Sequence, residues 1–88
     1  MAANMKIQIL YFAQLADELG TKTETFESNS NALSVAELKT ELSSRGAIWS
    51  QKMAAQSTRC AVSQKIADDQ TLIRDANEVA FFPPVTGG

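Results

Sequence analysis

The chain has 88 residues, of which 44% are hydrophobic and 20% are charged, and its formal net charge is −2. This length allows one domain with a modest core, and the composition is that of a globular protein and not of a disordered one. The ten acidic and eight basic residues are scattered along the chain. A surface for nucleic acid or for an anionic membrane needs clustered Lys and Arg, so we expect neither partner.

The usual side-chain chemistry of catalysis is missing from this sequence. There is no histidine, and Cys60 is the single cysteine. Ser-His and Cys-His nucleophile pairs and most zinc sites are therefore excluded, and we expect no metal site. No stretch approaches the roughly 20 apolar residues of a membrane span, and the first residues, MAANMK, lack the apolar segment of a signal peptide. Together with the lone cysteine, these features predict a cytoplasmic protein.

Seven segments have the periodicity of a strand or a helix. In chain order we expect a strand at 5–12, a helix at 13–19, a strand at 21–27, a helix at 34–45, a further helical turn within 47–58, a strand at 59–67 and a strand at 78–82. The first strand is apolar enough on both faces to be central, and Gly20 is expected to end the first helix. The strand at 59–67 is expected to be broken by a turn at Gln64 and Lys65. Residues 28–31 and 68–78 are expected to be polar connections.

The strongest helix signal begins at Ser34. With Glu37 three residues later, Ser34 forms a capping box, and Leu38 and Leu42 fall on one face of the helix. Gly46 is expected to end this helix. Runs of strands around one main helix predict an α+β fold in which the helix packs on one face of a sheet.

The chain closes on FFPPVTGG, which raises the question of what such an ending is for. Pro83 cannot donate to a sheet ladder, and with Pro84 it favours an extended conformation, so the tail is expected to leave the domain stiffly. We therefore divide the chain into a domain of residues 1–82 and a tail of residues 83–88. Two final glycines alone are equally consistent with a frayed terminus.

The tip of this tail would carry its chemistry. Gly87 and Gly88 present bare backbone that can thread a channel too narrow for any Cβ atom, while Val85 and Thr86 offer a partner a small apolar side chain and a hydroxyl. The functional group would be the α-carboxylate of Gly88. A carboxylate is a poor electrophile and must first be activated, most economically as an acyl-adenylate. A partner enzyme can supply both the nucleotide and the base.

Two aromatic pairs pose a choice between core and surface. Phe81 and Phe82 point to opposite faces of the last strand. One is expected in the core and the other at the base of the tail, where it would help to dock a partner, although burial of both is the alternative. Tyr11 and Phe12 pose the same choice, and there the core is favoured.

Other conspicuous residues have structural explanations. Cys60 could act as a sulfur relay, but a free cysteine in the middle of a strand is usually buried and inert. Trp49 and Met53 are expected to pack as a satellite of the core. Asp68 and Asp69 point apart in a solvated turn and do not form a paired-carboxylate site.

The sequence NEVAFFPPVTGG closely resembles the C-terminus of the small, sulfur-carrier subunit of molybdopterin synthase, a family with a ubiquitin-like β-grasp fold. ILYFAQLADELG resembles the first strand and helix of that family, and AVSQKIA resembles its third-strand segment. The resemblance implies a mixed sheet of about five strands with one main helix packed on one face. Ala16 and Ser63 depart from the family, which often has a basic residue and an asparagine at these positions.

The resemblance also implies a function. A ubiquitin-activating-like adenylyltransferase would use ATP to adenylate Gly88, and a sulfur donor protein would convert the adenylate to a thiocarboxylate, a C-terminal 1-thioglycine. The chain itself would bind no cofactor. The tail would insert into the large synthase subunit, with which the family forms a heterotetramer, and would deliver sulfur to cyclic pyranopterin monophosphate to build the molybdopterin dithiolene. The partner-binding residues would be Phe82, Pro83, Pro84, Val85, Thr86 and Gly87.

Three other functions are compatible with such a tail. A thiamin-type sulfur carrier also ends in Gly-Gly, but the FFPP approach speaks against it. A ubiquitin-like protein modifier would join Gly88 to lysine through an isopeptide bond. The fourth possibility is a plain interaction domain with an incidental tail.

Overall fold

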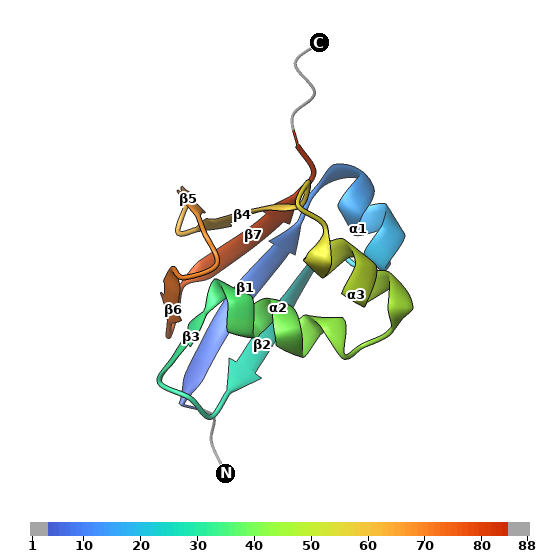
Figure 1. Ribbon diagram of the computed structural model, residues 1–88. Coiled ribbons are helices and arrows are strands. Elements are labelled where there is room, and N and C mark those ends of the chain that lie inside the picture. Colours follow the sequence, from blue (N-terminus) through green and yellow to red (C-terminus); the bar gives the residue numbers. More distant parts are fainter. Residues whose placement is uncertain (1–3, 85–88) are drawn as a thin grey trace.

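The computed structural model describes residues 4–84, in which three helices lie on one side of a β-sheet (Figure 1). The strands are β1 (Met5–Tyr11), β2 (Thr23–Ser28), β3 (Ala32–Ser34), β4 (Arg59–Val62), β5 (Lys65–Ala67), β6 (Leu72–Arg74) and β7 (Glu78–Phe82). The helices are α1 (Ala13–Leu19), α2 (Val35–Ser43) and α3 (Ala47–Ala54). The predicted strands at the two ends of the domain and the predicted first helix are confirmed.

Five strands form one mixed sheet in the order β2-β1-β7-β4-β5. The central pair, β1 and β7, is parallel, and the other pairs are antiparallel. This confirms the expected α+β arrangement of about five strands with helices on one face. Because β7 is the middle strand, the chain leaves the domain from the centre of the sheet (Figure 1).

The β1–α1–β2 unit follows its sequence pattern closely. Alternate residues of β1 are buried, from Met5 to Tyr11, and the residues between them face the other side of the sheet. Gly20 ends α1 with φ 78°, a left-handed conformation that glycine adopts without a steric penalty. Strand β2 then pairs antiparallel with β1.

Helix α2 begins as predicted but ends earlier. The Ser34 hydroxyl accepts a hydrogen bond from the Glu37 amide at 3.0 Å, and the Glu37 carboxylate accepts one from the Ser34 amide at 2.9 Å, which completes the capping box. The prediction that Gly46 ends this helix is wrong. Serine hydroxyls at 43 and 44 donate to helix carbonyls at 2.7 Å and end α2. Gly46, with φ 151°, instead precedes α3.

Two short strands and one turn position escaped prediction. β3 and β6, of three residues each, form a separate two-stranded sheet that buries Leu33 and Ile73. Three residues are too few to display a period of two, so 28–34 and 68–78 resembled loops. The β4–β5 turn lies at Ser63 and Gln64, one residue earlier than predicted, and both residues have positive φ (51° and 71°), as in type I′ hairpins.

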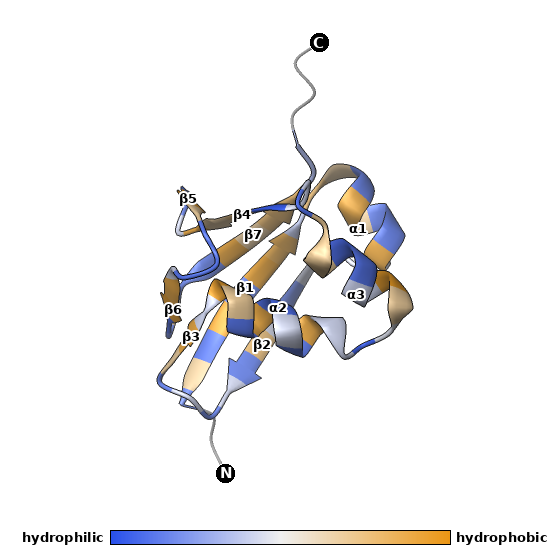
Figure 2. Cartoon of the chain, viewed as in Figure 1, coloured by the Kyte–Doolittle hydropathy of each residue, from blue (hydrophilic) through white to orange (hydrophobic). Residues whose placement is uncertain are grey.

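The core lies between the helices and the facing side of the sheet. Leu38 and Leu42 of α2 and Leu15 of α1 pack against strand residues such as Ile9 and Phe81. Trp49 packs against the edge of this core, as predicted, but Met53 of α3 is buried within the core itself and is not part of a satellite. Figure 2 shows the same distribution, with hydrophobic colouring concentrated on β7 and the adjoining part of β1 and hydrophilic colouring on β2. In the described residues, all three helices contribute to this one core, which leaves the opposite side of the sheet without a helix.

Candidate functional site: the open face of the sheet and the base of the tail

The last described residues lead the chain away from the end of β7. Phe82, opposite Arg59, is the final residue paired with β4, and Pro83 then ends the ladder because it has no amide hydrogen. Pro83 is half-buried and Pro84 is exposed. The predicted tip of the tail, Val85, Thr86, Gly87 and Gly88, lies outside the described residues, so its role and the division into domain and tail stay predictions.

Adjacent residues of β7 face opposite sides of the sheet. Phe81 is fully buried against the helices, whereas Phe82 is half-buried on the side without helices. The expectation that one phenylalanine lies in the core is confirmed, and the alternative in which both are buried is wrong. Phe82 is therefore available to a partner at the base of the tail, although its role in binding stays a prediction.

An apolar row crosses four strands on the side without helices. Leu10 of β1 lies opposite Ala80 of β7, Ala80 lies opposite Ala61 of β4, and Ala61 lies opposite Ile66 of β5. Residues directly opposite in a sheet share a face, so these four side chains form one continuous row. We call this row, with Phe12 and Phe82 beside it, the open face.

Phe12 corrects the expectation that both aromatic residues at the end of β1 lie in the core. Tyr11 is buried, but Phe12 is 48% exposed. The reason is alternation: Tyr11 takes the core position, and Phe12, still extended at φ −113°, turns to the side of Leu10. The Phe12 amide donates to the Phe81 carbonyl at 3.1 Å, which places Phe12 beside Phe82 at the base of the tail.

Ile66 is the most exposed large apolar residue of the described chain, with 73% of its surface accessible. Sequence reasoning did not single it out. Ile66 follows Lys65 in a short hairpin, and it is not part of any apolar pattern with the period of a helix or a strand. Only the register with Ala61 reveals that Ile66 extends the apolar row to the edge of the sheet.

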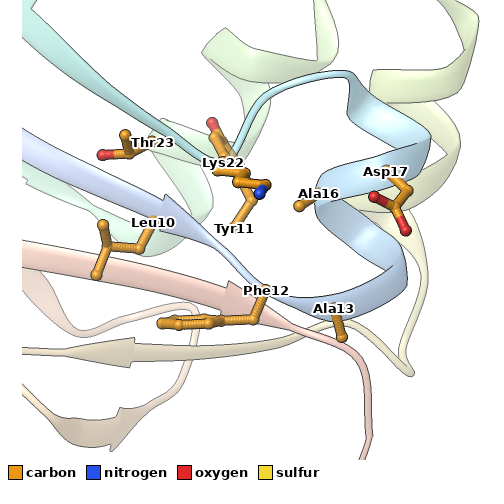
Figure 3. Close-up of a pocket in the computed structure, with 8 residues that line it drawn as sticks. All are labelled: Leu10, Tyr11, Phe12, Ala13, Ala16, Asp17, Lys22 and Thr23. Carbon is orange, nitrogen blue, oxygen red and sulfur yellow. The ribbon is translucent and has the colours of Figure 1, made fainter.

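A hollow adjoins the open face beside Phe12 (Figure 3). Leu10 lines it from β1, Phe12 lines it from the residue between β1 and α1, and Ala16 lines it from α1. Ala16 is only 7% exposed, so the departure from the family at this position replaces a basic residue with a small buried one. The polar residues of the lining are Asp17, Lys22 and Thr23.

A polar and aromatic cluster supports β1 and β7 from the core side. The Tyr11 hydroxyl donates to the Glu24 carboxylate at 2.8 Å, and Arg45 donates to both oxygens of that carboxylate at 2.7 Å. Arg45 also lies over the ring of Trp49, with its guanidinium carbon 4.7 Å from the ring centroid. Tyr11 stacks with Phe81 at 6.0 Å and meets Trp49 edge-on at 5.5 Å. The cluster thus joins the segment after α2 to the strand that carries the tail.

The protonation states of this cluster follow from its contacts. The hydrogen bonds from Arg45 hold the pKa of Glu24 below its usual range. Burial, with the neighbouring Glu24 carboxylate, raises the pKa of Tyr11 far above that of a free phenol. At neutral pH the cluster therefore contains a neutral tyrosine, a carboxylate and a guanidinium.

Cys60 is a buried structural residue. It is 4% exposed, and burial raises the pKa of its thiol to about 11, so the thiolate form is scarce at neutral pH. The interpretation of Cys60 as inert is confirmed, and a relay of sulfur through this residue has no support. Asp68 accepts bonds from its own turn, and Asp69 pairs with Lys39 at 2.8 Å, so the two carboxylates do not act as a pair.

Two features are absent from residues 4–84. Within this range, no group of three or more histidine, cysteine, aspartate or glutamate side chains is arranged to hold a metal ion. None of the helices in the same range is long and apolar enough to cross a membrane.

Residues 9–88 match the model of the ThiS family. The chain belongs to the ThiS family. Among curated relatives, it is 32% identical over 82 residues to the molybdopterin synthase sulfur carrier subunit of Escherichia coli (strain K12), which covers 93% of this chain and 99% of the relative. The match to the family model reaches the last residue of the chain, Gly88.

Solved structures similar to this ThiS-family chain have the same fold. SAMP1 from Haloferax volcanii is 20% identical with a TM-score of 0.77, and the match covers 94% of this chain and 99% of that chain. In a complex of subunits 1 and 2 of molybdopterin-converting factor from Helicobacter pylori, the matched chain is 19% identical with a TM-score of 0.65, with 96% of this chain and 100% of that chain covered. These matches confirm the ubiquitin-like β-grasp fold expected from the sequence.

Proposed function

We propose that this ThiS-family chain is the sulfur-carrier subunit of molybdopterin synthase. The similarity of 82 residues to a curated subunit of that name carries the proposal. The geometry supports it, because β7 delivers the chain from the centre of the sheet through Pro83 and Pro84, next to an apolar face without a helix. A domain whose task is to present its own C-terminus to an enzyme needs such a docking surface beside the exit.

The proposed chemistry takes place at Gly88. A carboxylate oxygen attacks the α-phosphorus of ATP in the active site of an adenylyltransferase, and pyrophosphate leaves. Sulfur supplied at the oxidation level of sulfide by a donor protein then attacks the acyl carbon and displaces AMP, leaving a thiocarboxylate. In the synthase, this sulfur attacks a carbon of cyclic pyranopterin monophosphate and displaces the oxygen bonded to that carbon, and water then cleaves the acyl–sulfur bond, which restores the carboxylate and leaves the sulfur on the pterin. The carrier supplies the acyl group, and its partners supply the active sites.

The occupant proposed for the open face is the large subunit of the synthase. Phe12, Phe82 and Ile66 project from this face and would be buried by a partner that also receives the tail. The Helicobacter pylori neighbour is described as a complex of subunit 1 with subunit 2, which supports a partner of this kind. The heterotetramer, the adenylyltransferase and the sulfur donor protein complete the proposed set of partners, in a cytoplasmic setting.

The decisive experiment is intact-protein mass spectrometry. The chain is incubated with ATP, the adenylyltransferase and a sulfur donor, and we expect one oxygen to be replaced by sulfur at Gly88. Deletion of Gly88 is the negative control and should abolish the change. An unchanged mass, in a reaction where a known carrier is converted, would overturn the proposal.

A second measurement separates the alternatives. Lys-Gly-Gly remnants on other proteins would indicate a modifier, and rescue of a thiamin-requiring deletion strain would indicate a thiamin-type carrier. Gly87→Ala, which adds a Cβ atom near the tip, is expected to impair sulfur transfer to the pterin while leaving the melting temperature unchanged. Equal loss of activity and melting temperature would contradict a role of Gly87 in threading a partner's channel.

A further inference from the structure

Two charged side chains stand on the open face on opposite sides of the apolar row, one toward each end of β7. Arg59 lies opposite Phe82, at the end from which the tail departs, and it is exposed. Glu78 lies opposite Gln8, at the far end, and it is half-buried. The ion pairs within residues 4–84 join Lys39 to Asp69, Arg45 to Glu24 and Lys52 to Glu18. Neither Arg59 nor Glu78 has an ion-pair partner in this part of the chain.

The other charged residues of this face offset each other, as do Lys22 and Asp17 of the adjoining hollow. Lys6 of β1 lies opposite Glu27 of β2, and both are exposed on the same side as Leu10. Thr23 and Thr25 complete that side of β2 and are neutral. The open face therefore has a positive end beside the tail and a negative end away from it, with apolar side chains between them.

The separation of the two charges suits one docked surface. Glu78 and Phe82 are the first and last residues of β7. At ~3.3 Å per residue, Glu78 is therefore about 13 Å, measured along the strand, from the position of Phe82 and of Arg59 opposite it. A partner that covers the apolar row would also remove water from Arg59 and from Glu78. A charge that loses its water needs an opposite charge or hydrogen-bond partners, or binding is penalised.

We infer that Arg59 and Glu78 set the direction in which the large subunit docks on the open face. The fitting partner presents a carboxylate to Arg59, which can hold it through two parallel hydrogen bonds, and a lysine or arginine to Glu78. The inference rests on the proposed function, because it names the chemistry of that partner's surface.

The apolar row alone does not fix the orientation of a docked partner. A partner turned by half a rotation would make similar contacts with its side chains, which are Leu10, Ala80, Ala61 and Ile66. In the turned complex, like charges would face each other on both sides of the row, and this repulsion excludes it. With the charges matched, the tail beside Arg59 points to one defined side of the partner. Arg59 and Glu78 are thus positioning residues and take no part in the chemistry.

Binding of the full chain to the large subunit from the same organism tests the inference. We expect Arg59→Glu to weaken binding about tenfold or more, mainly by slowing association, and Glu78→Lys to have a smaller effect in the same direction. Arg59→Gln, which loses the charge but adds no repulsion, should lie between wild type and Arg59→Glu. Arg74→Glu is the matched control, because Arg74 is exposed on β6, outside the five-stranded sheet. It carries the same change of charge and should leave binding unchanged.

Three readouts decide the outcome. The defect of Arg59→Glu should shrink at high salt, and one acidic residue of the large subunit changed to lysine should restore binding to this variant but not to Ile66→Ser. If wild type binds while Arg59→Glu and Arg74→Glu weaken binding equally, or not at all, the inference is overturned and the proposed function stands. If wild type itself does not bind the large subunit, the proposed function fails, and the inference fails with it. Unchanged thermal melting of each variant shows that a loss of binding is not a loss of fold.

Discussion

The two faces of the central strands, β1 and β7, share one backbone but differ in function. On the face toward the helices, Ile9, Val79 and Phe81 have no accessible surface. On the open face, their neighbours Leu10 and Phe82 remain half-exposed. Because a strand alternates its side chains, one residue of β7 stabilises the domain while the next is left free for a partner. Substitutions on the two faces should therefore separate folding from binding.

The largest expected effect is on the inner face. Phe81→Ala should lower the free energy of unfolding by about 3–5 kcal/mol, because it removes a buried ring from the core and leaves a cavity. Urea denaturation measures this loss. Phe82→Ala is the matched control and should cost less than ~1 kcal/mol, since its ring is partly exposed. Equal losses for the two variants would show that the faces do not differ in this way.

On the open face, the effect should appear in binding. Ile66→Ser is expected to weaken binding to the large subunit by about 2 kcal/mol, or ~30-fold. Its free energy of unfolding should stay within ~0.5 kcal/mol of wild type, because the side chain is largely exposed. Leu72→Ser, which changes a 51% exposed residue on β6, is the control and should leave affinity unchanged. Titration calorimetry measures both affinities. Similar losses of affinity for Ile66→Ser and Leu72→Ser would mean that general surface hydrophobicity, and not a specific patch, supports binding.

The polar cluster beneath β1 should make part of the stability depend on pH. The pKa of Glu24 is lowered on folding, chiefly by hydrogen bonds from Arg45, so its stabilisation is present above the unfolded-state pKa of about 4.3 and is lost as the pH falls through the lower folded value. Glu24→Gln should cost about 1 kcal/mol at pH 7, a modest figure because the pair is partly exposed to solvent.

As the pH falls from the unfolded-state pKa of about 4.3 through the lower folded pKa, wild type and Glu24→Gln should converge in stability, because the carboxylate is protonated first in the unfolded state and then in the folded state. Glu27→Gln, an exposed change on the other face of β2, should show no such convergence. Unfolding curves measured at several pH values provide the test. A constant difference between Glu24→Gln and wild type at every pH would mean that the ion pair does not supply the stabilisation.

The smallest effect is expected at the β4–β5 turn, which serves neither face directly. Ser63 has φ 51°, a region that asparagine tolerates better than serine. Ser63→Asn should raise the free energy of unfolding by a few tenths of a kcal/mol, roughly the scale of such backbone preferences. Loss of the 3.2 Å contact from the Asn77 amide to the Ser63 hydroxyl works against this gain. Destabilisation in thermal melts would mean that the side-chain contact outweighs the backbone preference.

The sequence predicted the elements whose signals are local. Gly20 and the capping box of Ser34 and Glu37 each depend on residues within one helical turn, and the structure places both as expected. Gly46 misled because a glycine beside a helix is compatible with the end of one helix or the start of the next. The serine hydroxyls at 43 and 44, and not the glycine, determine where α2 ends.

The part of the site that was predicted lies within a single strand, β7. The opposite orientation of Phe81 and Phe82, and the end of β7 at Pro83, follow from alternation and from the missing proline amide. These local rules do not determine which of the two phenylalanines faces the core, because both are equally apolar. Burial of Phe81 depends on helices that arrive from elsewhere in the chain.

What the sequence determined by itself is a mixed α+β domain whose last strand ends at Pro83, before the predicted tail, because strand alternation, capping and proline geometry are local physical effects. What only the tertiary structure decided is the surface around that tail. Ile66, Phe12 and Arg59 are far apart in the chain and come to one face through the pairing of β1, β7, β4 and β5. Register is a long-range property, set by which strands pair and which face the helices cover, and no local pattern contains it.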